Sequence, residues 1–123
     1  MEKIKLVIWD LDDTFWKGTL SEGNIEIIPE NIQILKRLTN HGIVNSIVSK
    51  NDYKTVMDVL EKQMPDEKNL FVLSSIDWAP KGKRVKKLLE RMRLRAENVL
   101  MIDDNPHNLE EIKYENPGIN CII

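Results

Sequence analysis

The fold follows from residues 4–14, which read IKLVIWDLDDT. The first six of these residues are β-rich and contain no breaker, a pattern typical of a buried central strand. The strand ends at Asp10 and therefore carries an acid at its C-terminal end. Asp12 follows two residues later, so on extended backbone the two carboxylates point to the same side.

Segments of strand length alternate with segments of helical periodicity from this stretch to the end of the chain. Further strands are predicted at residues 43–48, 70–73, 98–102 and 119–123, with a short hairpin at 25–28. Helices are predicted to begin near Pro29, Asp52, Pro80 and Asn105. The first helix is expected to end at Gly42 and to bury Ile34, Leu35 and Leu38, and Trp9 is expected in the core. This alternation predicts an α/β fold in which one domain, residues 1–123, contains a parallel sheet with helices on both faces.

The charge of the chain is balanced overall. The 123 residues include 18 Lys and Arg against 20 Asp and Glu, for a formal net charge of −2. No global basic field therefore favours nucleic acid or an anionic membrane as a partner. Residues 81–95 contain eight basic residues and one acid, but the apolar residues between them have helical spacing, which indicates a solvated helix face.

The sequence predicts neither a membrane-spanning segment nor a disulfide. The longest apolar stretches have the length of one strand, far below the ~20 residues that span a bilayer, and the N-terminus lacks a signal-peptide pattern. Cys121 is the only cysteine, which excludes an internal disulfide and fits a reducing compartment. We therefore expect a cytoplasmic protein without a membrane partner.

Polar residues collect where the predicted strands end, which is where open α/β sheets bind ligands. They are Asp10, Asp12 and Thr14 after the first strand, Ser49 and Asn51 after the second, Lys81 beyond the third, and Asp103 and Asp104 after the fourth. Four acids at one edge would repel one another unless a cation neutralised them. A divalent ion with oxygen ligands, most simply Mg²⁺, does so, and the lack of His and Cys argues against zinc.

Phosphoryl transfer uses every member of this set. A carboxylate that attacks phosphorus forms an acyl phosphate, and Asp10 is the best candidate because it lies directly at the strand end. Asp12 could protonate the departing alkoxide and later accept a proton from water. Lys81 would balance charge, while Ser49 and the backbone N–H groups that follow it would hold phosphate oxygens.

These residues resemble the four ordered motifs of the haloacid dehalogenase (HAD) superfamily, and the resemblance covers nearly the whole chain. More narrowly, residues 10–18 (DLDDTFWKG), 49–52 (SKND), 78–81 (WAPK) and 102–106 (IDDNP) resemble the FkbH-like branch, HAD subfamily IIIC. The resemblance implies a Rossmann-like three-layer sandwich whose five parallel strands have the order 5-4-1-2-3. It also implies an aspartyl-phosphate intermediate on Asp10.

The same resemblance implies the ligands of the site. Mg²⁺ would be bound by Asp10, the backbone carbonyl of Asp12, and Asp103, with Asp104 as a further candidate. Substrate or phosphate contacts would come from Leu11, Thr14, Trp16, Ser49, Lys50, Asn51 and Trp78. Apart from the resemblance, the positions of Trp16 and Trp78 next to the motifs suggest that their rings stack on the substrate.

Two features bear on the substrate, a small-molecule phosphate ester. Val48 stands where FkbH-like proteins that load a glyceryl group carry a cysteine, which favours phosphate-ester hydrolysis over glyceryl or acyl transfer. The short connections at both usual insertion sites leave no room for a cap domain. An open site of this kind predicts a homo-oligomer that buries residues 15–28, and family members also occur as modules beside another domain or an acyl carrier.

Other classes remain as alternatives. A receiver domain places similar residues at strand ends, but it accepts phosphate on an aspartate after its third strand, where this sequence is expected to end in Ser74 and Ser75. A non-catalytic interaction module and a glyceryl- or acyl-transfer module also stay open. An EF-hand is excluded by Phe15 at the glycine position of the loop, and a P-loop by Arg84 in place of its hydroxyl residue.

Overall fold

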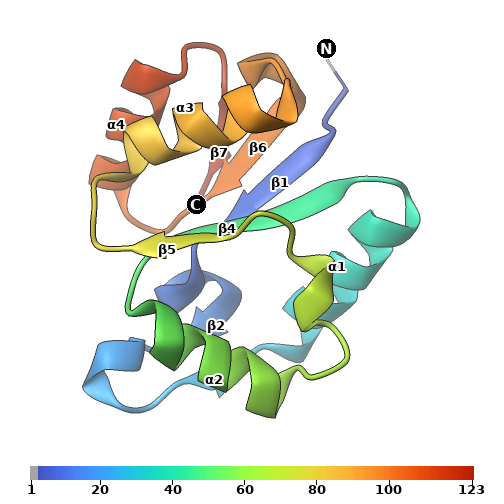
Figure 1. Cartoon of the computed structure of the whole chain (residues 1–123), viewed down its shortest axis with the longest axis vertical. Helices are drawn as coiled ribbons and strands as arrows, with labels where there is room; N and C mark the ends of the chain where they lie inside the picture. The colour runs from blue at the N-terminus through green and yellow to red at the C-terminus, as the bar shows by residue number, and fades with distance from the viewer. Residues whose placement is uncertain (1–2) are drawn as a thin grey trace.

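A five-stranded parallel sheet forms the centre of the molecule (Figure 1). The computed structural model describes residues 3–123. The sheet strands are β1 (Leu6–Trp9), β4 (Val44–Lys50), β5 (Ser75–Asp77), β6 (Val99–Ile102) and β7 (Asn120–Ile122). Their spatial order is β5-β4-β1-β6-β7, so β1 lies between β4 and β6 and is central, as its unbroken apolar pattern predicted.

The order of labels differs from the expected 5-4-1-2-3, because two strands of a separate hairpin take numbers in the chain. These are β2 (Trp16–Lys17) and β3 (Glu26–Ile27), which pair antiparallel outside the main sheet. When only the five sheet strands are counted along the chain and read from β7, the neighbours follow the expected order.

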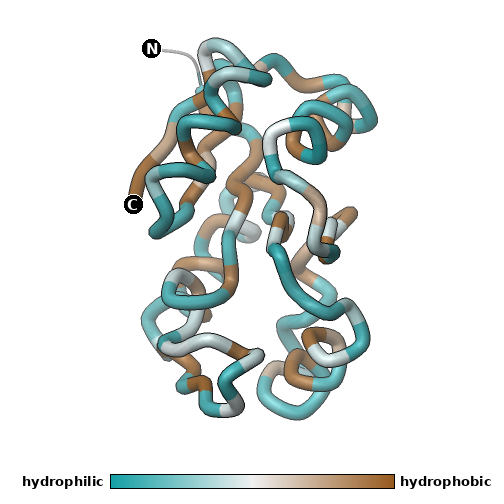
Figure 2. Tube along the Cα trace, turned by 90° about the vertical axis from the view of Figure 1, so that its left-hand side faces the viewer, coloured by the Kyte–Doolittle hydropathy of each residue, from teal (hydrophilic) through white to brown (hydrophobic). Residues whose placement is uncertain are grey.

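Helices cover both faces of the sheet, as predicted (Figure 1). The helices α1 (Pro29–Asn40) and α2 (Tyr53–Gln63) lie on one face, and α3 (Lys81–Met92) and α4 (Pro106–Glu115) lie on the other. Alternate residues of β1 serve two cores: Val7 and Trp9 pack with α1 and α2, and Leu6 and Ile8 pack with α3 and α4. Hydrophobic residues accordingly run through the strands at the centre, and hydrophilic ones occupy the outer turns (Figure 2).

The predicted third strand at residues 70–73 is wrong. Residues Lys68–Leu70 form a 3₁₀ turn, Phe71 makes a single bridge to Asn45, and the strand β5 begins only at Ser75. The apolar run resembles a strand, but only Phe71 is buried, and Leu73 has a φ of 52°, which interrupts extended backbone. Ile34 is also a wrong prediction, because 40% of it is exposed, whereas Leu35 is buried.

Residues 11–28 connect β1 to α1 and lie beside the carboxyl ends of the strands. Leu11–Phe15 forms a tight turn in which Asp13 has a φ of 51°, and Leu20–Glu22 forms a 3₁₀ turn between β2 and β3. Gly18 has a φ of 91°, and a Cβ there would lie 2.4 Å from the carbonyl oxygen of Asn24. Glycine is therefore required at this position to close the hairpin.

The remaining short element is a 3₁₀ turn at Ala96–Asn98, which precedes β6. Within residues 3–123, none of the helices combines the length and the apolar character that crossing a membrane requires.

Candidate active site

Three carboxyl groups meet at the carboxyl ends of β1 and β6. Asp10, Asp103 and Asp104 each present an oxygen, and these oxygens all lie within 4.8 Å of one another. The reason is the register of the sheet: Trp9 pairs with Ile102, so the residues that follow both strands leave the sheet side by side. Asp10 and Asp103 are buried and Asp104 is exposed, so the cluster opens to solvent on one side.

Lys81, the first residue of α3, places its ammonium group between the two buried acids. Its Nζ lies 2.8 Å from Asp10 Oδ1 and 2.6 Å from Asp103 Oδ2, and only 1% of the lysine is exposed. A buried charge is tolerated when it is paired and hydrogen-bonded, and this lysine has two partners. Lys81, which the sequence places near the start of a helix, therefore lies with its ammonium group inside the acid cluster.

Two buried carboxylates facing one ammonium leave an excess of negative charge. Burial is the main cause that raises the pKa of Asp10, to about 7; Lys81 acts against this rise, and the neighbouring Asp103 adds to it. The donor set of the cluster consists of carboxylate oxygens, which hard divalent cations prefer. The residues present therefore fit a Mg²⁺ ion, which would supply the missing positive charge.

Thr14 joins the exposed acid to the buried one. Its hydroxyl lies 3.2 Å from Asp10 Oδ2 and 3.2 Å from Asp104 Oδ1, and its single proton can be donated to one of them at a time. The hydroxyl oxygen also accepts the backbone N–H of Asp104 at 3.2 Å. Thr14 thus connects the residues that follow β1 and β6 by hydrogen bonds. The sequence predicted only a substrate contact for this residue.

The carboxylate of Asp12 accepts hydrogen bonds from a network of neutral donors. Its Oδ1 accepts the indole N–H of Trp16 and the backbone N–H of Leu20, each at 3.0 Å. Its Oδ2 accepts an amide proton from Asn51 at 3.1 Å. The same amide nitrogen lies 3.1 Å from the hydroxyl of Ser49, so Asn51 links Asp12 to the end of β4.

Trp16 corrects one expectation. The sequence suggested a ring that stacks on the substrate, but Trp16 is fully buried in the core beneath β1. Its indole N–H donates to Asp12, and its backbone pairs with Ile27 in the hairpin of β2 and β3. Trp78 differs, because 63% of it is exposed, so its ring remains accessible at the start of α3.

A cavity of about 250 Å³ opens above the acid cluster. Its walls are formed by Asp10, Asp12, Asp13, Thr19, Lys50, Lys81, Asp104, Asn105 and Asn108. Asp10, Asp12, Lys50, Lys81 and Asp104 are thus brought to one cavity as the sequence predicted. Ser49 and the side chain of Leu11 are fully buried, so Leu11 has only its backbone to offer a ligand there.

The sequence analysis missed several residues of the site, among them Asp13, Thr19, Asn105 and Asn108 of the cavity wall and Arg84 beside it. Asn108 lies on the first turn of α4, and its amide is 3.4 Å from Asp103 Oδ2. Arg84 donates to the carbonyls of Ser49 and Ser75 at 2.9 and 2.7 Å, which ties α3 to the ends of β4 and β5. The spacing of three residues from Lys81 was the available signal for Arg84, because residues three apart share a helix face.

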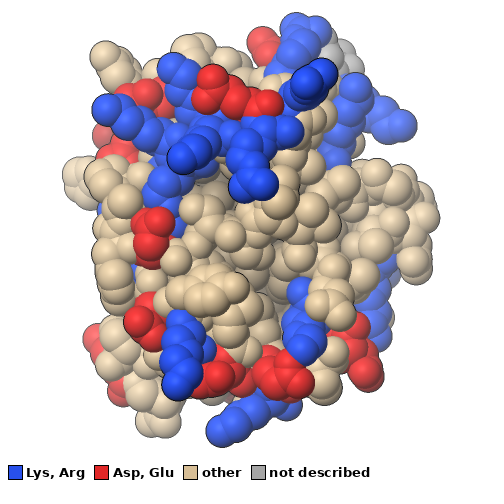
Figure 3. Space-filling view, viewed as in Figure 1, with Lys and Arg blue, Asp and Glu red and all other residues tan. Residues whose placement is uncertain are grey.

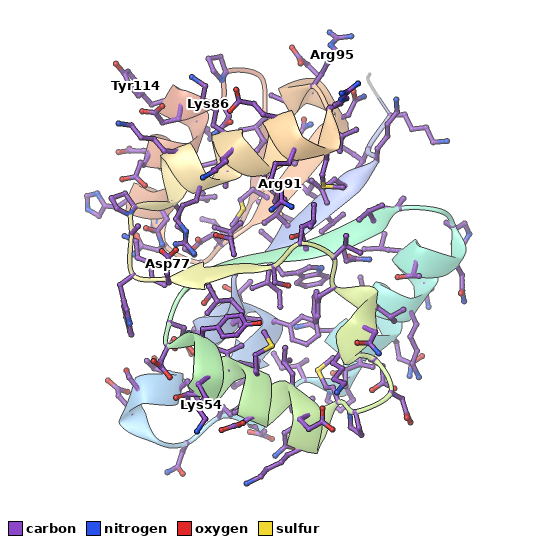
Figure 4. The ribbon with its side chains drawn as sticks, viewed as in Figure 1. Lys54, Asp77, Lys86, Arg91, Arg95 and Tyr114 are labelled. Atoms are coloured by element: carbon purple, nitrogen blue, oxygen red, sulfur yellow. The ribbon has the colours of Figure 1, made fainter. Side chains whose placement is uncertain are left out.

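The other basic residues of α3 behave as the sequence predicted. Lysine and arginine side chains cover the outer surface of α3 in the space-filling view (Figure 3). Lys86 and Arg91 extend from this helix, and Asp77 lies at the end of β5 near the N-terminus of α3 (Figure 4). Arg84 is the exception in this series, since it turns toward the sheet and forms an ion pair with Asp77 at 3.2 Å.

The sequence model of the haloacid dehalogenase-like hydrolase family matches residues 13–122. The chain belongs to this family. Its fold is also that of several solved structures. One is the N-terminal part of protein BF1531 from Bacteroides fragilis, which contains a phosphatase domain complexed with Mg. The TM-score is 0.90 and the identity 22%, over 98% of this chain and 36% of that chain.

Two further solved structures show the same fold. The cobalt-bound deoxy-D-mannose-octulosonate 8-phosphate phosphatase of Haemophilus influenzae has a TM-score of 0.74 and 20% identity, over 94% of this chain and 66% of that chain. A HAD family enzyme of Bacteroides thetaiotaomicron, complexed with magnesium and inorganic phosphate, has a TM-score of 0.75 and 13% identity, over 97% and 93%. No curated protein sequence matches the chain significantly. The chain spans about a third of the first of these structures and two thirds of the second.

Proposed function

We propose that this protein is a Mg²⁺-dependent phosphatase that hydrolyses phosphate monoesters through an aspartyl-phosphate on Asp10. One observation carries the proposal: Asp10 lines the cavity, and the Nζ of Lys81 lies 2.8 Å from its Oδ1. The other carboxylate oxygen remains on the side of Thr14 and Asp104. A nucleophile needs this combination of a fixed position and nearby positive charge to approach an anionic phosphate.

The residues that would hold Mg²⁺ are Asp10, Asp103 and Asp104 through their side chains and Asp12 through its backbone carbonyl. When bound, the ion neutralises the acids and polarises a phosphate oxygen. Two of the similar structures contain magnesium and one contains cobalt, which supports a divalent ion in this site.

The reaction has two displacements. In the first, an oxygen of Asp10 bonds to phosphorus while the bond from phosphorus to the leaving oxygen breaks, and Asp12 donates a proton to that oxygen to release an alcohol. In the second, water attacks the same phosphorus and gives a proton to Asp12. The bond from phosphorus to Asp10 breaks, so inorganic phosphate leaves and both carboxyl groups return to their starting states.

Further residues are proposed to contact the phosphate and the rest of the substrate during these two steps. Lys81 and Lys50 supply positive charge within the cavity, and Thr14 and Asn51 supply polar groups beside it. Ser49 and the backbone of Leu11 are further proposed contacts for phosphate oxygens. Trp78 is exposed and is the proposed contact for the leaving group.

A small-molecule phosphate ester is the proposed substrate class, and the motif resemblance supports the FkbH-like branch. Val48 in place of a cysteine supports hydrolysis over glyceryl or acyl transfer. We also propose that the domain works beside an attached domain or an acyl carrier. A homo-oligomer would use residues 17–28, because Phe15 and Trp16 are already buried within one chain. We place the protein in the cytoplasm without a nucleic-acid or membrane partner.

A receiver domain is disfavoured for a corrected reason. The third sheet strand does end at an acid, Asp77, contrary to the sequence expectation. However, β5 is the edge of the sheet beyond β4, whereas in the receiver order 2-1-3-4-5 the third strand adjoins the first. Asp77 instead pairs with Arg84 and caps the backbone N–H of Ala79.

The test is phosphate release from p-nitrophenyl phosphate and from a panel of metabolite monoesters, with Mg²⁺ and with a chelator. We expect repeated turnover with Mg²⁺ and none without it. Stoichiometric labelling by acetyl phosphate without turnover would instead support the receiver class. Turnover that is unaffected by the chelator would contradict the proposed role of the acid cluster.

A further inference from the structure

The two oxygens of the Asp12 carboxylate have unequal surroundings. Oδ1 accepts two N–H groups, from the Trp16 indole and the Leu20 backbone, each at 3.0 Å. Oδ2 accepts one, from Asn51 at 3.1 Å. A carboxylate oxygen has two lone pairs in its plane, so the two donors occupy Oδ1 while Oδ2 keeps one lone pair available.

The Trp16 donor is fixed by the core. Trp16 is fully buried, packs in the cluster that contains Trp9 and Phe15, and begins the hairpin strand β2. A buried indole N–H needs an acceptor, and its partner here is the Asp12 carboxylate. The hydrogen bond therefore couples the orientation of Asp12 to the hydrophobic core rather than to the metal or to solvent.

We infer that Trp16 is a positioning residue, which together with the Leu20 N–H occupies Oδ1 of Asp12 and so assigns the transferred proton to Oδ2. In the protonated acid, Oδ1 is then the carbonyl oxygen that accepts both N–H groups, and Oδ2 carries the proton. This inference rests on the proposed phosphatase function, in which Asp12 protonates the leaving oxygen. This role explains why a tryptophan stands at position 16, where the sequence suggested a ring that stacks on the substrate.

The inference makes a prediction that a purely structural role does not make. Losing the indole N–H frees a lone pair on Oδ1 and lets the carboxyl group rotate, so the proton is no longer held on one oxygen. A poor leaving group such as an alkoxide depends on this proton, whereas p-nitrophenolate leaves with little protonation. The loss should therefore slow alkyl phosphate esters more than aryl phosphate esters.

The experiment measures kcat for benzyl phosphate and for p-nitrophenyl phosphate in Trp16→Phe, with Mg²⁺ present. We expect a fall of roughly 10- to 100-fold for benzyl phosphate, the scale on which misplacement of a catalytic group acts, and less than about threefold for p-nitrophenyl phosphate. Asp12→Asn sets the full extent of the effect on the same pair of esters.

Trp9→Phe is the matched control. Trp9 is also buried in the same core cluster and donates its indole N–H to Asn45 Oδ1 at 2.9 Å, away from Asp12. The substitution removes the same atoms and an equivalent buried hydrogen bond. We expect it to leave the ratio of the two ester rates at the wild-type value, even if thermal unfolding shows a similar loss of stability.

A second variant separates the N–H from the volume of the ring. Benzothienylalanine in place of Trp16 keeps the bicyclic shape and replaces the N–H by sulfur, and it should reproduce the altered ratio with a smaller change in stability. Equal slowing of both esters in this variant, or unchanged rates for both, would overturn the positioning role. A wild-type protein that hydrolyses neither ester would overturn the phosphatase proposal itself, which is a different outcome.

Discussion

Asp10 and Asp12 are two residues apart, yet they lie in opposite kinds of surroundings. Asp10 faces charged groups, with the Lys81 ammonium at 2.8 Å and the acids Asp103 and Asp104 nearby. Asp12 faces neutral donors from Trp16, Leu20 and Asn51. We call these the charged side and the neutral side of the site. The charged side depends on cations for its balance, whereas the neutral side keeps its geometry through the core and the hairpin.

The largest expected effect comes from the charged side. Asp10→Asn replaces the nucleophilic carboxylate by a neutral amide, and the phosphate-release assay should show a loss of at least roughly 10⁴-fold, as for other essential nucleophiles. Circular dichroism should show an unchanged fold, because the amide has nearly the same shape. Retained turnover would move the nucleophile role away from Asp10 and remove the main distinction between the two sides.

The neutral side should show a graded effect. Asp12→Asn removes the proton donor, and we expect the rate for benzyl phosphate to fall by roughly 10²- to 10⁴-fold, the usual contribution of acid and base catalysis. The fall for p-nitrophenyl phosphate should be clearly smaller, since its leaving group needs little protonation. Equal losses for the two esters would argue against Asp12 as the acid.

Stability should distinguish the sides as well. Lys81→Met leaves Asp10 and Asp103 buried without their ammonium partner, and breaking a buried pair in this way costs about 3–5 kcal/mol. Urea unfolding in a chelator would measure this loss, and adding Mg²⁺ should restore part of it. Lys83→Met on the exposed face of α3 is the matched control and should change stability by less than about 0.5 kcal/mol. Similar losses in both variants would contradict the buried ion pair.

The smallest effect concerns pH in the metal-free protein. The pKa of Asp10 is raised from 3.8 to about 7 by burial, so between these values the folded protein holds a proton that the unfolded chain has released. The free energy of unfolding should therefore fall as the pH rises from about 4 to about 7, by at most about 1.4 kcal/mol per unit, and then level off.

Asp10→Asn is the control for this pH dependence, because the amide does not titrate. Its stability advantage over the wild type should grow across the same interval in urea unfolding with a chelator. A difference between the two proteins that stays constant with pH would contradict the raised pKa. The neutral side should not add to this pH dependence. In Trp16→Phe, the free energy of unfolding should therefore vary with pH as it does in the wild type.

The residues at the ends of the strands were easier to predict than the positions of the strands themselves. The acids after β1 and β6 were expected together because parallel strands deliver their C-terminal ends to one edge, and the register of Trp9 with Ile102 agrees. The strand at residues 70–73 was misplaced, because an apolar run can supply one core residue, Phe71, and still turn away at Leu73. Local pattern does not distinguish these cases.

The roles within the site were less accessible to sequence. Asp10 and Asp12 were expected on one side and do line one cavity, but the sequence did not indicate that the Asp12 carboxylate accepts the indole N–H of Trp16. Arg84 was grouped with the exposed basic residues of α3, although it reaches the ends of β4 and β5. The contact of Arg84 with Ser49 joins segments that are distant in the chain, and the local contact of Trp16 with Asp12 depends on the burial of Trp16 in the core.

The sequence by itself determined the parallel α/β sheet with its helices, the acidic edge, and the family to which the chain belongs. It could do so because alternating periodicity and residues at strand ends are local properties. Only the tertiary structure decided that Lys81 is buried between two acids and that Trp16 holds Asp12 from the core. These assignments require packing and hydrogen bonding across the fold, since burial and the choice of partner arise only when separate elements come together.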